Sequence, residues 1–341
     1  MDLYEGLGYL QLTYQEQQAY SVMLNAFSSM EASFDYSGID DKVDLMKVLQ
    51  TVTGDNPQVF YFNNTFIKTE RSGYEKRIIL TDVYSKSSTD KMLNTLESKT
   101  DQIISDLKSI SDDGYSLLIN LYHYIQKNIH YDEKEFKSIS NGKSKNPFSH
   151  NAYGALINGL AVCDGFSSAF SLLAQKLGFE CMLAVGHSAY SSRSFTNHAW
   201  NIIKIQDSFY HIDSTWDTRK FDEFREYSYV YLLNNDIEIA NDHKWDRNTT
   251  PSCDNSDLSY YRINDLYFYD LDELIADICN KLENQTYIFR YRISYDIPIP
   301  KNTGEYLADK ILNEAVKHLQ RARISYGWNE HARCFFGMLV N

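Results

Sequence analysis

This chain of 341 residues contains few prolines, glycines and cysteines, the residue types that are typical of collagen-like, low-complexity and disulfide-rich proteins. Five prolines and 15 glycines are too few for collagen-like or low-complexity segments. The five cysteines form an odd number without a C-x-x-C pair, which indicates neither a disulfide framework nor a zinc site. No apolar run is long enough for a membrane-spanning helix. We therefore expect an ordered, soluble protein with reduced thiols.

Long basic runs are also absent, and the formal net charge is −13. A nucleic-acid partner is not expected, because binding to phosphates needs a basic face. The first twenty residues lack the basic and apolar regions of a secretory leader, which predicts a cytoplasmic protein if the chain is complete. A chain whose leader had been removed would look the same, so a secreted or cell-envelope location stays open.

The length is sufficient for more than one domain. We expect an N-terminal α+β domain over residues 1–105, a core over 106–250 and a C-terminal β-α-β domain over 251–341. The boundary before the last domain is placed in the polar stretch 242–257. Other expected elements are helices over 16–26, 91–110, 117–129 and 303–322, strands over 59–62, 78–80, 287–295 and 332–340, and a polar loop over 138–150.

The clearest local pattern follows Cys163. Apolar residues recur there at intervals of three and four, and Gly178 stands where a helix commonly ends. Cys163 is therefore predicted at the N-terminus of a helix. The free N–H groups and the partial positive charge at that end favour an anionic sulfur.

His198 and Asp213 are predicted on the two arms of a hairpin. A strand over 181–185, a rim loop over 186–196 and a turn near 206–208 frame this hairpin. An even-residue turn places positions of opposite parity on one face, so the two side chains can point the same way. A turn at Asp207-Ser208 would pair Ile202 with Asp213, and a turn at Ile205-Gln206 would set His198 opposite Asp213. The sequence leaves this register open.

A thiol, an imidazole and a carboxylate in this order are typical of a cysteine nucleophile with its base and its orienting group. The imidazole keeps the sulfur anionic, and the carboxylate fixes the tautomer and direction of the ring. Each residue taken alone has an ordinary structural explanation: a buried thiol, a core histidine and a turn aspartate. Cys163, His198 and Asp213 are the candidate catalytic residues because their motifs occur together.

Other side chains near these motifs have weaker claims to function. Tyr153 could donate a hydrogen bond to a developing oxyanion together with the backbone N–H of Cys163, although packing of its ring is at least as good an explanation. Trp200 and Trp216 are expected as walls beside the site or as core residues. The remaining histidines of this region are interpreted as structural or exposed, and no metal site is expected: His150, His187 and His211.

With these residues described, the chain resembles the transglutaminase-like superfamily, in a branch of bacterial multidomain proteins with a papain-like core. The resemblance covers about residues 110–245, with weaker likeness in the flanking regions. It rests on these motifs: Tyr131-Asp132, His150-Asn151-Ala152-Tyr153-Gly154, Gly159-Leu160-Ala161-Val162-Cys163-Asp164-Gly165-Phe166, Asn197-His198-Ala199-Trp200-Asn201, Tyr210-His211-Ile212-Asp213-Ser214-Thr215-Trp216-Asp217 and Tyr231-Leu232-Leu233 up to His243.

The resemblance implies an α+β fold in which the helix that bears the nucleophile packs on an antiparallel sheet. It also implies cysteine-dependent acyl transfer or hydrolysis at amide or peptide bonds, with Cys163 as nucleophile, His198 as base and later acid, and Asp213 as orienting group. Crosslinking, deamidation and peptidase outcomes stay open, as does a catalytically idle binding or scaffolding module. The expected partner is a protein or peptide substrate, with the cell envelope as one source, and no cofactor is expected.

Overall fold

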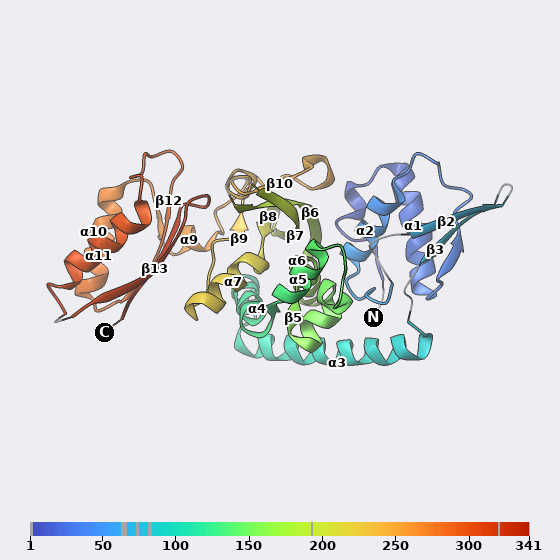
Figure 1. Ribbon diagram of the computed structural model, residues 1–341, viewed down its shortest axis with the longest axis horizontal. Coiled ribbons are helices and arrows are strands. Elements are labelled where there is room, and N and C mark those ends of the chain that lie inside the picture. The colour runs from blue at the N-terminus through green and yellow to red at the C-terminus, as the bar shows by residue number, and fades with distance from the viewer. Residues whose placement is uncertain are drawn as a thin grey trace. The chain divides into compact units, whose positions relative to one another are not determined.

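The computed structural model describes residues 3–62, 67–72, 75–80, 84–191, 194–319 and 321–340 (Figure 1). The chain forms two compact units, one made of Met1–Tyr231 with His243–Asp254 and the other of Leu232–Asp242 with Asn255–Asn341. Helices and strands are mixed throughout, which confirms the predicted α+β class. The predicted boundary between residues 105 and 106 falls within helix α3, and the division into three domains stays a prediction.

The first elements of the chain combine helices with a small sheet. They are η1 (Tyr9–Gln11), α1 (Tyr14–Ser28), β1 (Ser33–Asp35), α2 (Leu45–Asp55), β2 (Ile67–Ser72) and β3 (Glu75–Leu80), with the strands in the order β1-β3-β2. The strand predicted over residues 59–62 is wrong, because these residues form turns. Their aromatic rings are buried by tertiary packing, as in the contact of Phe62 with Phe27 at 4.8 Å between ring centroids.

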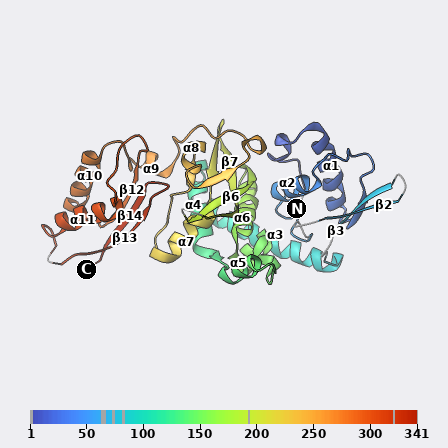
Figure 2. The same cartoon turned by 45° about the horizontal axis from the view of Figure 1, so that its top comes forward.

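The next segment leads from the long helix α3 to the helix that begins with Cys163. Its elements are α3 (Lys86–Ile110), α4 (Gly114–Asn128), β4 (His130–Tyr131), α5 (Glu133–Ser140), η2 (Pro147–His150), the π-helical turn η3 (Gly154–Asn158) and β5 (Leu160–Ala161). Figures 1 and 2 show α3 along one edge of the first unit. The loop predicted over 138–150 is partly helical, because its polar residues cap and join the short elements α5 and η2.

The centre of the first unit is helix α6 (Cys163–Lys176) against an antiparallel sheet. The strands β6 (Glu180–Ser191), β7 (Ser194–Ile205), β8 (Ser208–Ile212) and β10 (His243–Trp245) follow the order β10-β6-β7-β8. Gly178 has φ +96° and ends α6 as predicted. This arrangement confirms the predicted packing of the helix that begins with Cys163 on an antiparallel sheet.

One predicted loop is wrong because its residues belong to this sheet. The rim loop predicted over 186–196 is largely strand, since β6 extends to Ser191 and β7 begins at Ser194. The stretch 242–257, in which a domain boundary is predicted, also contributes to this sheet, because its strand β10 pairs with β6 through His243↔Ser188 and Trp245↔Gly186, and the chain passes to the second unit after Asp254. A methyl group on Gly186 would lie 2.2 Å from the carbonyl oxygen of Lys244, so only glycine allows β10 to approach. Helices α7 (Ser214–Phe224) and η4 (Arg247–Thr249) complete this unit.

The second unit contains β9 (Leu232–Asn234), α8 (Asp236–Ile239), α9 (Tyr260–Ile263), β11 (Tyr267–Phe268), α10 (Leu271–Glu283), β12 (Ile288–Ile293), α11 (Thr303–Ala315), β13 (Arg323–Asn329) and β14 (Cys334–Val340). The last four of its strands form a sheet in the order β11-β12-β14-β13, and Figures 1 and 2 show α10 and α11 on one face of it. Its core includes Leu274, Phe289, Leu307 and Phe335. The strands predicted on either side of α11 are present, whereas β13 and α10 were missed.

Within these described ranges, no helix combines the length and the apolarity that crossing a bilayer requires.

Candidate active site

Cys163 is the first residue of α6, as the sequence predicts. The preceding residue, Val162, provides no side-chain cap, and its N–H donates to the carbonyl oxygen of Ser149 over 2.9 Å. The close approach of Ser149 requires Gly165, because a methyl group there would lie 2.2 Å from the same oxygen. Cys163 is partly exposed. Its sulfur therefore lies where free N–H groups and the helix dipole favour negative charge.

His198 projects from β7 and has a 6% exposed side chain. Its Nε2 lies 2.7 Å from Oδ2 of Asp213. Burial disfavours the protonated ring, but the charge and hydrogen bond of Asp213, together with Cys163, raise the pKa of His198 to about 9. An imidazolium at neutral pH is the partner that a thiolate requires.

Asp213 follows β8, is fully buried and uses both carboxylate oxygens. Oδ1 accepts the backbone N–H groups of Thr215 and Trp216 at 3.0 and 3.3 Å, so the carboxylate caps the start of α7. Oδ2 accepts hydrogen bonds from two histidines, His198 and His243. Burial alone would raise the Asp213 pKa, but these two rings hold it well below its usual range.

The hairpin register differs from both alternatives that the sequence leaves open. The turn is at Gln206-Asp207, because Ile205 pairs with Ser208 and Asn201 pairs with Ile212. Gln206 has φ +55°, the left-handed conformation that such a tight turn requires. In this register Asp213 follows Ile212 on the face of His198, as the parity argument predicts, and the two meet diagonally.

His243 was missed by the sequence analysis. It lies on β10, is fully buried, and its Nε2 is 3.1 Å from Oδ2 of Asp213. The motif comparison extends to His243, but no local pattern assigns it a role, since it lies 30 residues from its partner. The ring atoms of His198 and His243 and the Asp213 carboxylate lie within 4.8 Å of one another, so these groups could also hold a metal ion.

The three pocket candidates occupy different environments. Trp200 is fully buried and its Nε1–H donates to Nδ1 of His211 over 3.0 Å, so this N–H is already used within the core. Trp216 is half-buried, with its ring centroid 5.9 Å from that of His198. The ring of Tyr153 packs against Phe60 and Phe148 with centroids 5.0 and 5.6 Å away.

The other histidines of the region also differ from one another. His187 is exposed, and His211 is buried against Trp200, which agrees with the sequence-based interpretation. His150 is not only a packing residue, because its ring bridges two carboxylates. Its Nδ1 lies 2.8 Å from Asp164, the residue after Cys163, and its Nε2 lies 3.2 Å from Glu135.

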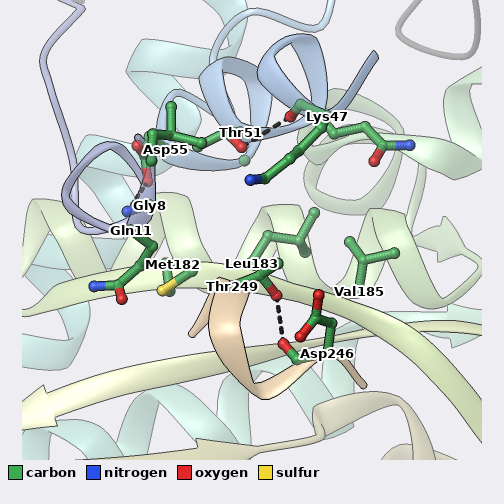
Figure 3. A pocket seen from close by; sticks show the side chains of 13 residues that line it. Gly8, Gln11, Lys47, Thr51, Asp55, Met182, Leu183, Val185, Asp246 and Thr249 are labelled. Atoms are coloured by element: carbon green, nitrogen blue, oxygen red, sulfur yellow. Dashed lines mark hydrogen bonds between the residues drawn. The ribbon is translucent and has the colours of Figure 1, made fainter. Parts of the chain in front are cut away.

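A separate cleft of about 230 Å³ lies between α2, β6 and the start of η4 (Figure 3). Lys47 and Asp246 lie on opposite walls, with Leu183 between them. The Lys47 ammonium is paired with Glu16 at 2.7 Å. None of the candidate catalytic residues lines this cleft, so it gives no support to the predicted chemistry.

The central region of the chain matches a known protein family. Residues 101–214 match the model of the transglutaminase-like superfamily, and this range includes Cys163, His198 and Asp213 but ends before His243. Among curated proteins, human kyphoscoliosis peptidase is 24% identical over 174 residues, which cover 48% of this chain and 24% of that protein. This chain therefore matches about a quarter of its relative's length.

Among the solved structures that match, two are each 12% identical and cover 44% of this chain. One is a TGase, of which 43% is covered at a TM-score of 0.31. The other is a Cytophaga hutchinsonii protein whose name proposes a cysteine protease, of which 61% is covered at a TM-score of 0.28. Residues 101–214, which contain the three candidate catalytic residues, are thus similar to the transglutaminase-like superfamily.

Proposed function

We propose that this protein is a cysteine enzyme that transfers the acyl group of an amide or peptide bond to Cys163. The observation that carries the proposal is the contact of His198 with Asp213 at 2.7 Å, on an imidazole whose pKa is also raised by Cys163. A buried carboxylate, an imidazolium and a sulfur at a helix N-terminus are the groups that such a reaction uses.

The reaction follows from these positions. The Cys163 thiolate attacks the carbonyl carbon, and its electron pair forms the C–S bond while the carbonyl oxygen becomes an oxyanion. Collapse of this intermediate breaks the C–N bond, and protonated His198 gives its proton to the leaving amine. Water or a second amine then attacks the thioester and gives its proton to His198; the C–S bond breaks with its electron pair on sulfur, which releases the acid or the new amide and restores the Cys163 thiolate and the His198 imidazolium. Asp213 stabilises the imidazolium and fixes the orientation of its ring throughout the reaction.

The oxyanion needs hydrogen-bond donors. The Cys163 N–H, at the first position of α6, has no partner four residues back within the helix and is the first candidate. Tyr153 remains a proposed second donor, although its observed contacts are with aromatic rings. Trp200 is a poor candidate because its N–H already donates to His211.

The proposed substrate is a protein or peptide, and the cell envelope is one proposed source. The acceptor that resolves the thioester decides between hydrolysis and amide exchange, because the catalytic groups are common to both. The peptidase name of the curated relative favours testing hydrolysis first.

The test is turnover of peptide libraries with and without a labelled primary amine, followed by mass spectrometry for cleavage, deamidation and amine incorporation. We expect one of these products from the wild type, and less than about a thousandth of that rate from Cys163→Ala. Cys279→Ser is the matched control, because this partly exposed cysteine lies in the second unit.

Activity that is equal in Cys163→Ala and wild type would refute the nucleophile assignment. Absence of every product, together with Cys163 labelling by iodoacetamide no faster than that of Cys279, would favour the idle binding module instead.

A further inference from the structure

A charged bridge lies directly beside the proposed nucleophile. His150, at the end of η2, contacts Asp164 of α6 through Nδ1 at 2.8 Å and Glu135 of α5 through Nε2 at 3.2 Å. The His150 side chain is 20% exposed and that of Glu135 is fully buried. The bridge therefore joins the first turn of the nucleophile helix to a neighbouring helix from a partly enclosed position.

His150 is positively charged at neutral pH. Burial opposes protonation of the ring, but the hydrogen bonds and negative charges of Asp164 and then Glu135 raise the pKa of His150 to about 9. Glu135 is a fixed anion in this cluster, because it also accepts hydrogen bonds from Ser144, from the N–H of Lys145 and from the N–H of Asn146. A neutral ring here would leave two carboxylates facing each other.

The position of Asp164 gives this bridge a consequence for Cys163. Asp164 is the second residue of α6, and its carboxylate would oppose negative charge on the neighbouring sulfur. The charges of Cys163 and Asp164 also act together on Tyr131. Burial and these two charges raise the pKa of Tyr131, while Arg219 lowers it. Without a cation on Asp164, the favourable field of the helix N-terminus would be partly cancelled.

We propose that His150 is a positioning residue for the nucleophile, which neutralises Asp164 and ties α5 to the first turn of α6. This inference rests on the proposed function, in which the Cys163 sulfur reacts as an anion. The charged groups that face the ring are Asp164 from α6 and Glu135 from α5, and Asp132 lies nearby through its hydrogen bond from Ser149.

The test is a double-mutant cycle of His150→Gln, Asp164→Asn and both together. The readout is the second-order rate of Cys163 alkylation by iodoacetamide at pH 7, followed on the peptide that contains Cys163. His150→Gln is expected to slow alkylation by about 3- to 10-fold, because it leaves the Asp164 charge uncompensated. Asp164→Asn is expected to accelerate it, and the double variant is expected to return close to the wild-type rate.

The recovery of the wild-type alkylation rate in the double variant distinguishes charge compensation from a structural role. If His150 acted only through packing, removal of the Asp164 charge would not restore the rate. His187→Gln is the control, because His187 is an exposed histidine on β6. An unchanged rate in His150→Gln, or a double variant as slow as His150→Gln, would overturn the proposal. If His150→Gln does not fold, the alkylation rate of Asp164→Asn is the deciding measurement. A rate equal to or below that of the wild type would overturn the proposal.

Alkylation is independent of amide turnover, so the two proposals can fail separately. If the cycle behaves as expected but no amide is processed, the proposed function fails and the charge bridge stands. If amides are processed and the cycle shows no coupling, only the role of His150 is lost.

Discussion

Replacing His243 tests the part of the site that the sequence did not reveal. His243 and Asp213 are both fully buried, and the contact of Nε2 with Oδ2 measures 3.1 Å. A hydrogen bond to a charged group contributes about 1.5–3 kcal/mol, so His243→Ala should lower the free energy of unfolding by at least that amount. The lost contacts of the ring with Trp200 and Trp216, each with centroids 5.0 Å away, add to this cost.

The loss corresponds to a fall of about 3–12 °C in the midpoint of thermal unfolding for a unit of this size. His243→Gln keeps a donor and most of the volume, and we expect it to recover more than half of the loss. Thermal unfolding followed by circular dichroism measures both. His187→Ala is the control, since an exposed histidine on the neighbouring strand should change stability by less than about 0.5 kcal/mol.

The same variants should affect the reaction. Without His243, the Asp213 carboxylate loses one of the two partners on Oδ2 and can turn away from His198, which would lower the raised pKa of His198. The alkaline limb of the rate profile should therefore move to lower pH in His243→Ala. A stability equal to that of the wild type, or a glutamine variant no better than alanine, would refute the hydrogen-bond argument.

Two further predictions concern pH and packing. Because the pKa of His198 is about 9 in the fold and about 6.5 when free, its stabilisation is complete below about pH 6.5 and is lost as the pH rises through 9. The melting temperature of the wild type should thus exceed that of His198→Gln at pH 6 and approach it at pH 10; a constant difference would contradict this. Gly186→Ala forces a methyl group to within 2.2 Å of the Lys244 carbonyl oxygen and should cost about 1–3 kcal/mol in urea unfolding. Gly38→Ala, with open space around it, should be neutral, and equal effects at the two positions would refute the packing argument.

Strand predictions failed where burial, rather than alternation, decided the structure. Residues 59–62 have the aromatic content of a strand, yet they are turns whose rings fill the space beside α1. Residues 186–191 look like a loop because Gly186 and the serines resist regular structure, yet they continue β6. Pairing with β7 and β10 supplies the backbone hydrogen bonds that local propensity does not predict.

The amino-acid sequence by itself determined the features that depend on near neighbours. The apolar spacing after Cys163 and the terminal Gly178 define α6, and the parity of His198 and Asp213 places them on one face of a hairpin. Three features were decided only by the tertiary structure. They are the register of the hairpin that turns at Gln206, the hydrogen bond of His243 with Asp213 and the bridge from His150 to Asp164. The last two contacts join residues that are 14 and 30 positions apart along the chain, and they form only when separate elements pack together, which no local periodicity encodes.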